Sequence, residues 1–151
     1  MTIVDLHEVE GRTYPAGRRT QNIVGGPSPI QARNFCMGMV TLEPRGGQVP
    51  WHNHDQEEVY LILEGEGEMC VGKELRTVQA GQAVWIPPGE YHQLTNRSDK
   101  PLRMLYCYGP AGDVAHWRQE LAGTLPRAGE EAPPLPEGAY PQFTGKPEAG
   151  D

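Results

Sequence analysis

Residues 51–58 read Trp-His-Asn-His-Asp-Gln-Glu-Glu, and this short stretch is the most informative in the chain for both fold and chemistry. Successive side chains of a β-strand point to opposite faces, so residues two apart share a face. His52 and His54 are therefore predicted to point in the same direction. Glu58 keeps the same parity if the strand resumes in phase after Gln56. The pattern predicts two imidazoles and one carboxylate on one face of a sheet.

A third imidazole comes from His92, which follows the turn residues Pro87-Pro88-Gly89 at the predicted start of another strand. Three imidazoles and a carboxylate form a nitrogen and oxygen set that can bind Fe(II), Mn(II), Co(II), Ni(II) or Zn(II). The histidine pair alone is weak evidence, because two histidines on a strand are often solvent-facing polar residues. Glu57 offers a carboxylate one residue early, and strand parity favours Glu58.

The wider spacing resembles the two-motif signature of the cupin family at all ten fixed positions. It reads Gly46-x5-His52-x-His54-x3-Glu58-x6-Gly65, followed by Gly81-x5-Pro87-x-Gly89-x2-His92-x3-Asn96. The resemblance implies a small β-barrel of the jelly-roll type. It also implies one divalent metal ion per chain inside the barrel, Fe(II) or Mn(II) in preference to Ni(II), Co(II) or Zn(II), with the ligands His52, His54, Glu58 and His92.

Composition limits the classes of protein to which the chain can belong. Its 151 residues suffice for one hydrophobic core, so a single domain is expected. The 13 Lys and Arg against 20 Asp and Glu give a net charge of −7, which argues against nucleic acid as a partner. The chain has no apolar run long enough for a membrane helix and opens without a basic and apolar leader, which favours a cytoplasmic protein. The three cysteines, Cys36, Cys70 and Cys107, are expected as buried thiols rather than as a disulfide framework.

Short apolar segments separated by turn residues predict an all-β fold, and the 19 Gly and 15 Pro agree with frequent turns. Strands are expected at residues 34–43, 49–54, 58–64, 68–71, 74–78, 83–86, 92–95 and 102–108. The predicted organisation is an N-terminal extension with strands that join the barrel (1–33), the barrel core (34–110), a short helix (111–125) and an extended tail rich in Pro and Gly (126–151).

The one predicted helix begins after Asp113, a suitable N-cap, and ends at Gly123. Three apolar side chains fall at helical spacing, Val114, Trp117 and Leu121. The tail that follows either lacks order or wraps over the same or a neighbouring subunit. Its apolar residues Leu135, Tyr140 and Phe143 are the positions that would make such contacts.

Strand alternation predicts which side chains share the face of the metal ligands and so line a substrate pocket. On the last strand, the inward set is either Met104, Tyr106 and Tyr108 or Arg103, Leu105 and Cys107. The tyrosine set suits an oxygen-rich ligand better. On the first strand, either Met37 and Met39 or Cys36 and Val40 face inward. The predicted pocket residues are Met37, Met39, Ile62, Leu94, Met104 and Tyr108, and the predicted catalytic residues are Tyr60 and Tyr106; core packing is the alternative role for all eight.

Four aromatic or imidazole side chains outside this set are given other roles. Trp51 and Trp85 are expected in the barrel wall. His7 and His116 are expected on the surface, although the predicted helix could bring His116 toward the mouth of the barrel.

The charge of the predicted metal centre indicates its substrate class. A divalent ion with one carboxylate and three neutral imidazoles has a net charge of +1 and two open positions on a six-coordinate metal. We therefore expect a metal-dependent enzyme that acts on a small polar substrate, anionic or chelating. Dioxygenase activity is favoured, because no free inward base is evident beyond the ligands.

Other functions stay open at this point. One group of alternatives comprises a sugar isomerase or epimerase, a lyase and a decarboxylase, in which Tyr60 or Tyr106 would be the base. Another alternative is a cupin that binds a sugar or other small molecule without transforming it. A homodimer is expected by analogy, because cupin barrels commonly pair through strand edges and the N-terminal residues Ile3, Val4 and Leu6 could add a strand.

Overall fold

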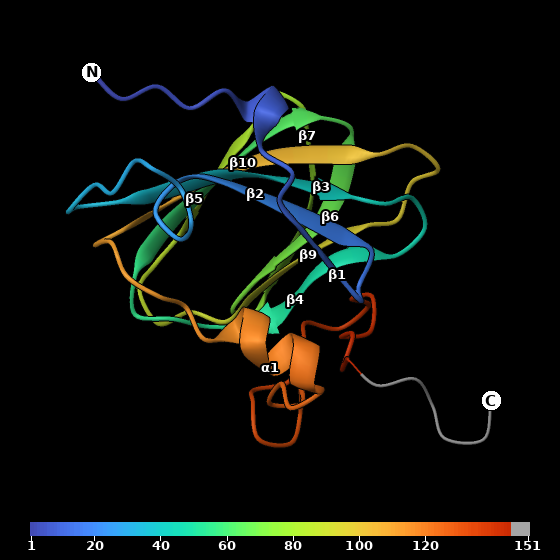
Figure 1. Cartoon of the computed structure of the whole chain (residues 1–151). Helices are drawn as coiled ribbons and strands as arrows, with labels where there is room; N and C mark the ends of the chain where they lie inside the picture. The colour runs from blue at the N-terminus through green and yellow to red at the C-terminus, as the bar shows by residue number, and fades with distance from the viewer. Residues whose placement is uncertain (146–151) are drawn as a thin grey trace.

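The computed structural model describes residues 1–145 and folds them into two antiparallel sheets (Figure 1). One sheet has the strand order β1-β2-β3-β10-β5-β8, and the other has the order β4-β9-β6-β7. The elements in chain order are η1 (Leu6–Glu8), β1 (Arg12–Tyr14), β2 (Arg18–Val24), β3 (Cys36–Leu42), β4 (Gly47–His52), β5 (Glu57–Glu64), β6 (Glu66–Val71), β7 (Glu74–Gln79), β8 (Ala83–Ile86), β9 (His92–Asn96), β10 (Leu102–Gly109) and α1 (His116–Ala122). The predicted all-β jelly-roll barrel with one short helix is confirmed.

The apolar core fills the space between the two sheets. Along β10, Leu102, Met104 and Tyr106 are buried, whereas the side chains between them are only partly buried. Tyr108 also packs against the core, so the tyrosine set is the inward one on this strand. The rest of the buried cluster comprises Val40, Leu42, Val49, Tyr60, Ile62, Met69, Val78, Ile86 and Leu94.

The face of strand β3 that packs against the core is the opposite of the predicted one. Its even-numbered residues face inward, with Val40 and Leu42 in the core, so Met37 and Met39 lie on the outer face. Gly38 shows why this register is required, because a Cβ at Gly38 would lie 2.5 Å from the hydroxyl of Tyr106 on the paired strand β10. Apolar residues occupy both faces of β3, so alternation alone could not distinguish them.

Helix α1 begins later than predicted. Its N-cap is Ala115, and the carboxylate of Asp113 instead accepts a hydrogen bond from the Trp117 indole at 3.1 Å and pairs with Arg118. Side-chain pairing within the turn therefore replaces capping. Gly123 ends the helix in the left-handed conformation, with φ of 70°, as predicted. Within residues 1–145, no helix is long and apolar enough to cross a membrane.

The described part of the tail wraps over its own barrel rather than lacking order. The indole N–H of Trp51 donates to the carbonyl of Pro133 at 2.9 Å, so Trp51 faces the tail and is buried beneath it. Gln142 donates to the carbonyls of Trp51 and Pro126 at 3.0 and 2.9 Å. The tail thus covers the end of β4, and Figure 1 shows it beside α1. The rest of the predicted tail, 146–151, lies outside the described residues.

Candidate metal centre

Three imidazoles meet at one end of the barrel. His52 is the last residue of β4 and pairs in register with His92, the first residue of β9, while His54 follows two residues after β4. One ring nitrogen from each of the three lies within 4.8 Å of the other two. His92 is fully buried and His52 nearly so. The predicted convergence of these three side chains is therefore present, and the cluster can hold a metal ion.

Each of these imidazoles is oriented in the same way by a backbone carbonyl two residues away. The Nδ1 atoms of His52, His54 and His92 lie 2.6, 2.9 and 2.9 Å from the carbonyl oxygens of Pro50, Gln56 and Glu90. A carbonyl can only accept, so each Nδ1 carries the proton and each Nε2 of a neutral ring presents a lone pair. Such a carbonyl contact at the far nitrogen is the usual support of a metal-binding histidine.

The Glu58 carboxylate meets two of these lone pairs. Its Oε1 lies 3.1 Å from His54 Nε2 and 3.3 Å from His92 Nε2. Lone pairs and a buried carboxylate repel one another unless a cation lies between them, either a metal ion or an added proton. His52 Nε2 and His92 Nε2 are also buried without a hydrogen-bond partner among the described residues. The donor set thus fits a divalent metal, with Glu58 at its side.

The pKa values of these groups reflect burial and the crowding of imidazoles. Burial, followed by the nearby His116, His92 and His54, holds the pKa of His52 well below its ordinary value. Burial also lowers the pKa of His54, but the Glu58 carboxylate outweighs that effect and raises it overall. Conversely, burial raises the pKa of Glu58, and the two histidines lower it overall. His52 is therefore neutral and free to ligate, and a proton competes with metal chiefly at His54.

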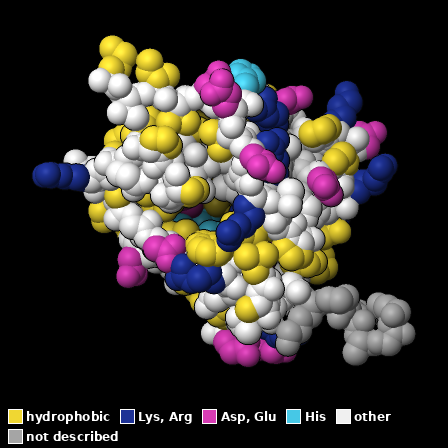
Figure 2. All heavy atoms as spheres, viewed as in Figure 1, with side chains coloured by type: hydrophobic (Ala, Val, Ile, Leu, Met, Phe, Trp, Pro, Cys, Tyr) yellow, Lys and Arg dark blue, Asp and Glu magenta, His cyan; other side chains and the backbone are white. Residues whose placement is uncertain are grey.

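A cavity of about 680 Å³ opens beside His52, His54 and Glu58. This volume lies in the range of pockets that enclose small-molecule ligands. Of the predicted site residues, Tyr60, Met104, Tyr106 and Tyr108 line the cavity. Figure 2 shows the hollow on this face, with a histidine side chain visible inside it.

Four predicted pocket residues lie elsewhere. Ile62 and Leu94 are fully buried in the core, because they stand deeper along β5 and β9 than the ligands. Met37 and Met39 lie on the outer face of β3, and Cys36 and Val40 line the cavity in their place. The reason is the register fixed at Gly38, which the alternation pattern could not reveal.

The cavity tyrosines are neutral phenols. Burial is the largest effect on the pKa of Tyr60, of Tyr106 and of Tyr108, and it raises all three above their ordinary value. The Tyr106 hydroxyl donates to Asn22 Oδ1, and the Tyr108 hydroxyl donates to the Gly112 carbonyl at 2.8 Å. These two phenols are thus held in place as hydrogen-bonding groups.

The expectation of a surface position for His116 is wrong. Its imidazole stacks on that of His52, with ring centroids 3.9 Å apart and planes 24° apart, and it lines the cavity. Its Nδ1 is buried and has no hydrogen-bond partner in the described part of the chain. A metal bonded to an imidazole lies in the plane of that ring, and two nearly parallel stacked planes cannot both contain the same ion. His116 is therefore a free imidazole beside the ligands.

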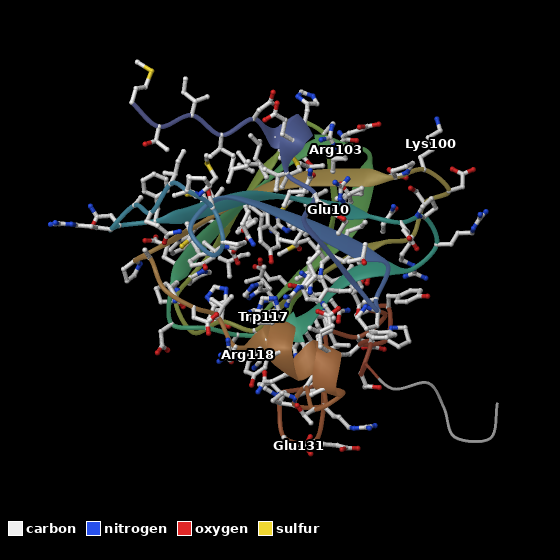
Figure 3. The ribbon with its side chains drawn as sticks, in the orientation of Figure 1. Glu10, Lys100, Arg103, Trp117, Arg118 and Glu131 are labelled. Carbon is white, nitrogen blue, oxygen red and sulfur yellow. The ribbon has the colours of Figure 1, made fainter. Side chains whose placement is uncertain are left out.

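Sequence reasoning missed this residue because it assigned the wrong face of α1 to the barrel. Glu120 is fully buried and lies one turn after His116, whereas Leu121 is exposed. The signal was the spacing of His116 and Glu120, since residues four apart share a helix face. A polar pair at that spacing does not stand out when apolar positions are used to find the buried face. Figure 3 shows Trp117 and Arg118 on the same helix, at this end of the barrel.

Comparison with known proteins agrees with the fold and with the resemblance to cupins. A family model described as a cupin domain matches residues 38–108. Solved structures with similar folds include an RmlC-like cupin from Shewanella frigidimarina and a cupin 2 conserved barrel protein from Salinispora arenicola. The chain belongs to the cupin superfamily.

Three more specific similarities are informative. An uncharacterized protein of Methanocaldococcus jannaschii is 38% identical over 70 residues, which cover 46% of this chain and 56% of that protein. Dimethylsulfoniopropionate lyase DddQ of Ruegeria pomeroyi is 33% identical over 87 residues, which cover 57% of this chain and 42% of the lyase. The crystal structure of TT1209 from Thermus thermophilus is 28% identical, with a TM-score of 0.60 over 73% of this chain and 98% of that one. The chain thus spans about half the length of the first two relatives.

Proposed function

We propose that this chain is a divalent-metal-dependent enzyme acting on a small polar substrate that is anionic or chelating. The observation that carries this proposal is the convergence of three imidazoles whose Nδ1 atoms face backbone carbonyls, so that their Nε2 lone pairs point toward one another and Glu58. His52, His54 and His92, with Glu58, would hold the metal, and Fe(II) or Mn(II) remains the favoured ion. The bound ion would act as a Lewis acid toward a substrate oxygen.

The position of His116 favours metal-assisted proton transfer, the chemistry of a lyase or an isomerase. The expectation of a dioxygenase depended on the lack of a free inward base, and His116 removes that reason. Its partnerless Nδ1 could take a proton from the substrate carbon next to the activated carbonyl or carboxylate, whose oxygen would receive the C–H electron pair. An isomerase would return the proton to a neighbouring carbon, whereas a lyase would expel a leaving group. The name of one relative, dimethylsulfoniopropionate lyase, supports this class.

The phenols would orient the substrate in this scheme. Tyr106 is fixed by its hydrogen bond to Asn22, and Tyr60 lies beside Glu58 on the same strand face. Neutral phenols do not act as bases. The single O–H of Tyr106 is already donated to Asn22, so Tyr106 would accept a hydrogen bond from a substrate hydroxyl, whereas Tyr60 would donate to a substrate oxygen.

Dioxygenase activity remains a second candidate. The cavity lining also includes Cys36, Val40, Val49 and Met104, which provide an apolar surface of the kind that suits dioxygen. Such a reaction requires a metal with open positions and does not require His116.

Metal analysis and substrate screening test these proposals together. The protein would be purified without an affinity tag, and its metal content would be measured. The Fe(II), Mn(II) and Zn(II) forms would then be tested with a panel of small hydroxy acids, diketones and catechols. Both product formation and oxygen uptake would be recorded. Turnover without oxygen uptake that falls at least 100-fold in His116→Gln, but not in the exposed control His7→Gln, would support proton transfer. Oxygen uptake that His116→Gln leaves unchanged would support the dioxygenase. A chain that retains no metal after loading would contradict the metal-dependent proposal.

A further inference from the structure

The cavity is also lined by a positively charged group outside the histidine cluster, the guanidinium of Arg18 at the start of β2. Arg18 is buried and lines the same cavity as the histidine cluster. Its Nη1 donates to Thr20 Oγ1 at 2.9 Å, its Nη2 pairs with Glu120 on α1, and its Cζ lies 3.9 Å from the ring centroid of Tyr14. These contacts fix the guanidinium at one place in the cavity wall.

One donor of this guanidinium is left over. Arg18 Nε is buried and has no hydrogen-bond partner among residues 1–145, and the same is true of Glu120 Oε1. An arginine and a carboxylate can form two parallel hydrogen bonds, but here they form one. A buried N–H without an acceptor is unfavourable, because its bond to water is lost and no bond replaces it. The arrangement therefore leaves a donor where a ligand can supply an acceptor.

The position of Arg18 relative to the metal centre follows from helix α1. Glu120 follows His116 by four residues, so the residue that pairs with Arg18 lies about 6 Å along the helix from the residue whose imidazole stacks on His52. Arg12 also lines the cavity on this side, with its guanidinium 5.0 Å from the Trp117 ring. A ligand that fills the cavity can thus contact the metal centre with one end and the arginines with the other.

We propose that Arg18 Nε anchors a second anionic group of the substrate, so that the substrate carries two carboxylate-like groups at opposite ends. This inference rests on the proposed function for one end only, since the metal centre would receive the first group. The second group would accept a hydrogen bond from Arg18 Nε, and the positive charge of Arg12 would favour it. Glu120 would hold the guanidinium in position and limit the net charge of the anchor.

The experiment compares the binding of linear dicarboxylates with that of monocarboxylates of equal length. Oxalate through adipate and acetate through hexanoate would be titrated calorimetrically into the zinc-loaded protein. The key variant is Arg18→Gln combined with Glu120→Gln, because removing both charges together avoids a lone buried carboxylate. The matched variant is Glu120→Gln alone, which keeps the arginine and removes the opposing charge.

A dicarboxylate longer than oxalate should bind the unmodified protein at least about tenfold more tightly than its monocarboxylate counterpart. This ratio of dicarboxylate to monocarboxylate affinity should fall to about one in the double variant and increase in Glu120→Gln. The monocarboxylate affinity of both variants should stay within about twofold of that of the unmodified protein. Equal affinity for both series, an advantage that survives in the double variant, or no binding of any dicarboxylate at millimolar concentration would overturn the proposal.

Metal content separates this inference from the proposed function. If the protein retains no zinc, but the double variant still binds dicarboxylates more weakly than the unmodified protein, the Arg18 anchor is supported and the metal centre is rejected. If the protein binds zinc and monocarboxylates, but its dicarboxylate affinity does not depend on Arg18, the metal centre is supported and the anchor is rejected. Circular dichroism and the thermal midpoint of each variant would establish that it is folded.

Discussion

The imidazole of His116 stacks on that of His52, with centroids 3.9 Å apart and planes 24° apart, although 64 positions separate the two residues in the chain. The contact joins the metal motif of the barrel to a helix outside the motif. Glu120 strengthens this connection, because it pairs with Arg18 from the same face of α1. The helix therefore contributes an imidazole to the cavity and is tied to β2 by a buried ion pair.

The first prediction concerns the stability of the metal-free protein as pH falls. Burial holds the pKa of His116 well below 6.5 in the folded protein, and Arg18, His92 and His54 lower it further. Below pH 6.5 the unfolded chain therefore binds a proton at this position that the folded chain does not. The free energy of unfolding should decrease with decreasing pH, by up to about 1.4 kcal/mol per pH unit for this group.

The variant His116→Gln isolates that effect. Its free energy of unfolding, measured by urea titration in EDTA between pH 7.5 and 5, should fall less steeply than that of the unmodified protein. His54 has a raised pKa and so an opposite slope, but it is present in both proteins and cancels in the comparison. Parallel curves would mean that His116 is protonated equally in the folded and unfolded states, in conflict with its position against His52.

A second prediction addresses the metal centre directly. His54→Ala removes one of the three imidazoles and should lower the affinity for Zn(II) or Mn(II) by at least about 100-fold, while the barrel stays folded. Titration with each metal, together with the near-ultraviolet circular dichroism spectrum, would measure both effects. The control is His7→Ala, because the His7 side chain is exposed and pairs with Asp5 away from the cavity. Full metal content in His54→Ala would remove His54 from the ligand set, and complete unfolding would assign the metal a structural role.

The sequence predicted the parts of the site that strand geometry determines. His52, His54, Glu58 and His92 are brought together by alternation and by turns between paired strands, and both leave a fixed spacing in the sequence. On β10, alternation left two inward sets open. The set chosen because it suits an oxygen-rich ligand, Met104, Tyr106 and Tyr108, is the one that faces inward.

The sequence could not predict contacts between elements that lack such a pattern. Met37 and Met39 are as apolar as Val40 and Leu42, so composition does not distinguish the two faces of β3, and the deciding residue is Gly38 beneath Tyr106. His116 and Arg18 enter the cavity through the packing of α1 against β2. One contact between these two elements is the buried ion pair of Arg18 and Glu120, which are 102 positions apart. No local periodicity reports an interaction of this range.

A third prediction tests the expected homodimer. On the outer face of β5 and β8, Val59, Leu63 and Trp85 are 37%, 47% and 59% exposed, and β8 is the edge of its sheet. An apolar patch at a free edge is a suitable site for a second copy. Light scattering at micromolar concentration should give the mass of a dimer, and Trp85→Glu should shift it toward the monomer. A monomeric unmodified protein would contradict the expectation, and Lys73→Glu on the other sheet serves as a charge-changing control.

The last prediction concerns the tail, which lies across the end of the barrel beside β4, the strand that carries His52. Gln142 joins three backbone groups: its amide donates to the carbonyls of Trp51 and Pro126, and its Oε1 accepts from Ala128 N–H at 2.8 Å. Because each of these three hydrogen bonds contributes about 1 kcal/mol, Gln142→Ala should lower the free energy of unfolding by about 3 kcal/mol and the thermal midpoint by about 8 °C. Glu137→Ala changes an exposed residue of the same tail and should have little effect. Since Trp51 immediately precedes His52, loosening the tail should also weaken metal binding, as measured by calorimetry. A midpoint that is equal in Gln142→Ala and Glu137→Ala would show that the tail contributes little to the stability of the barrel.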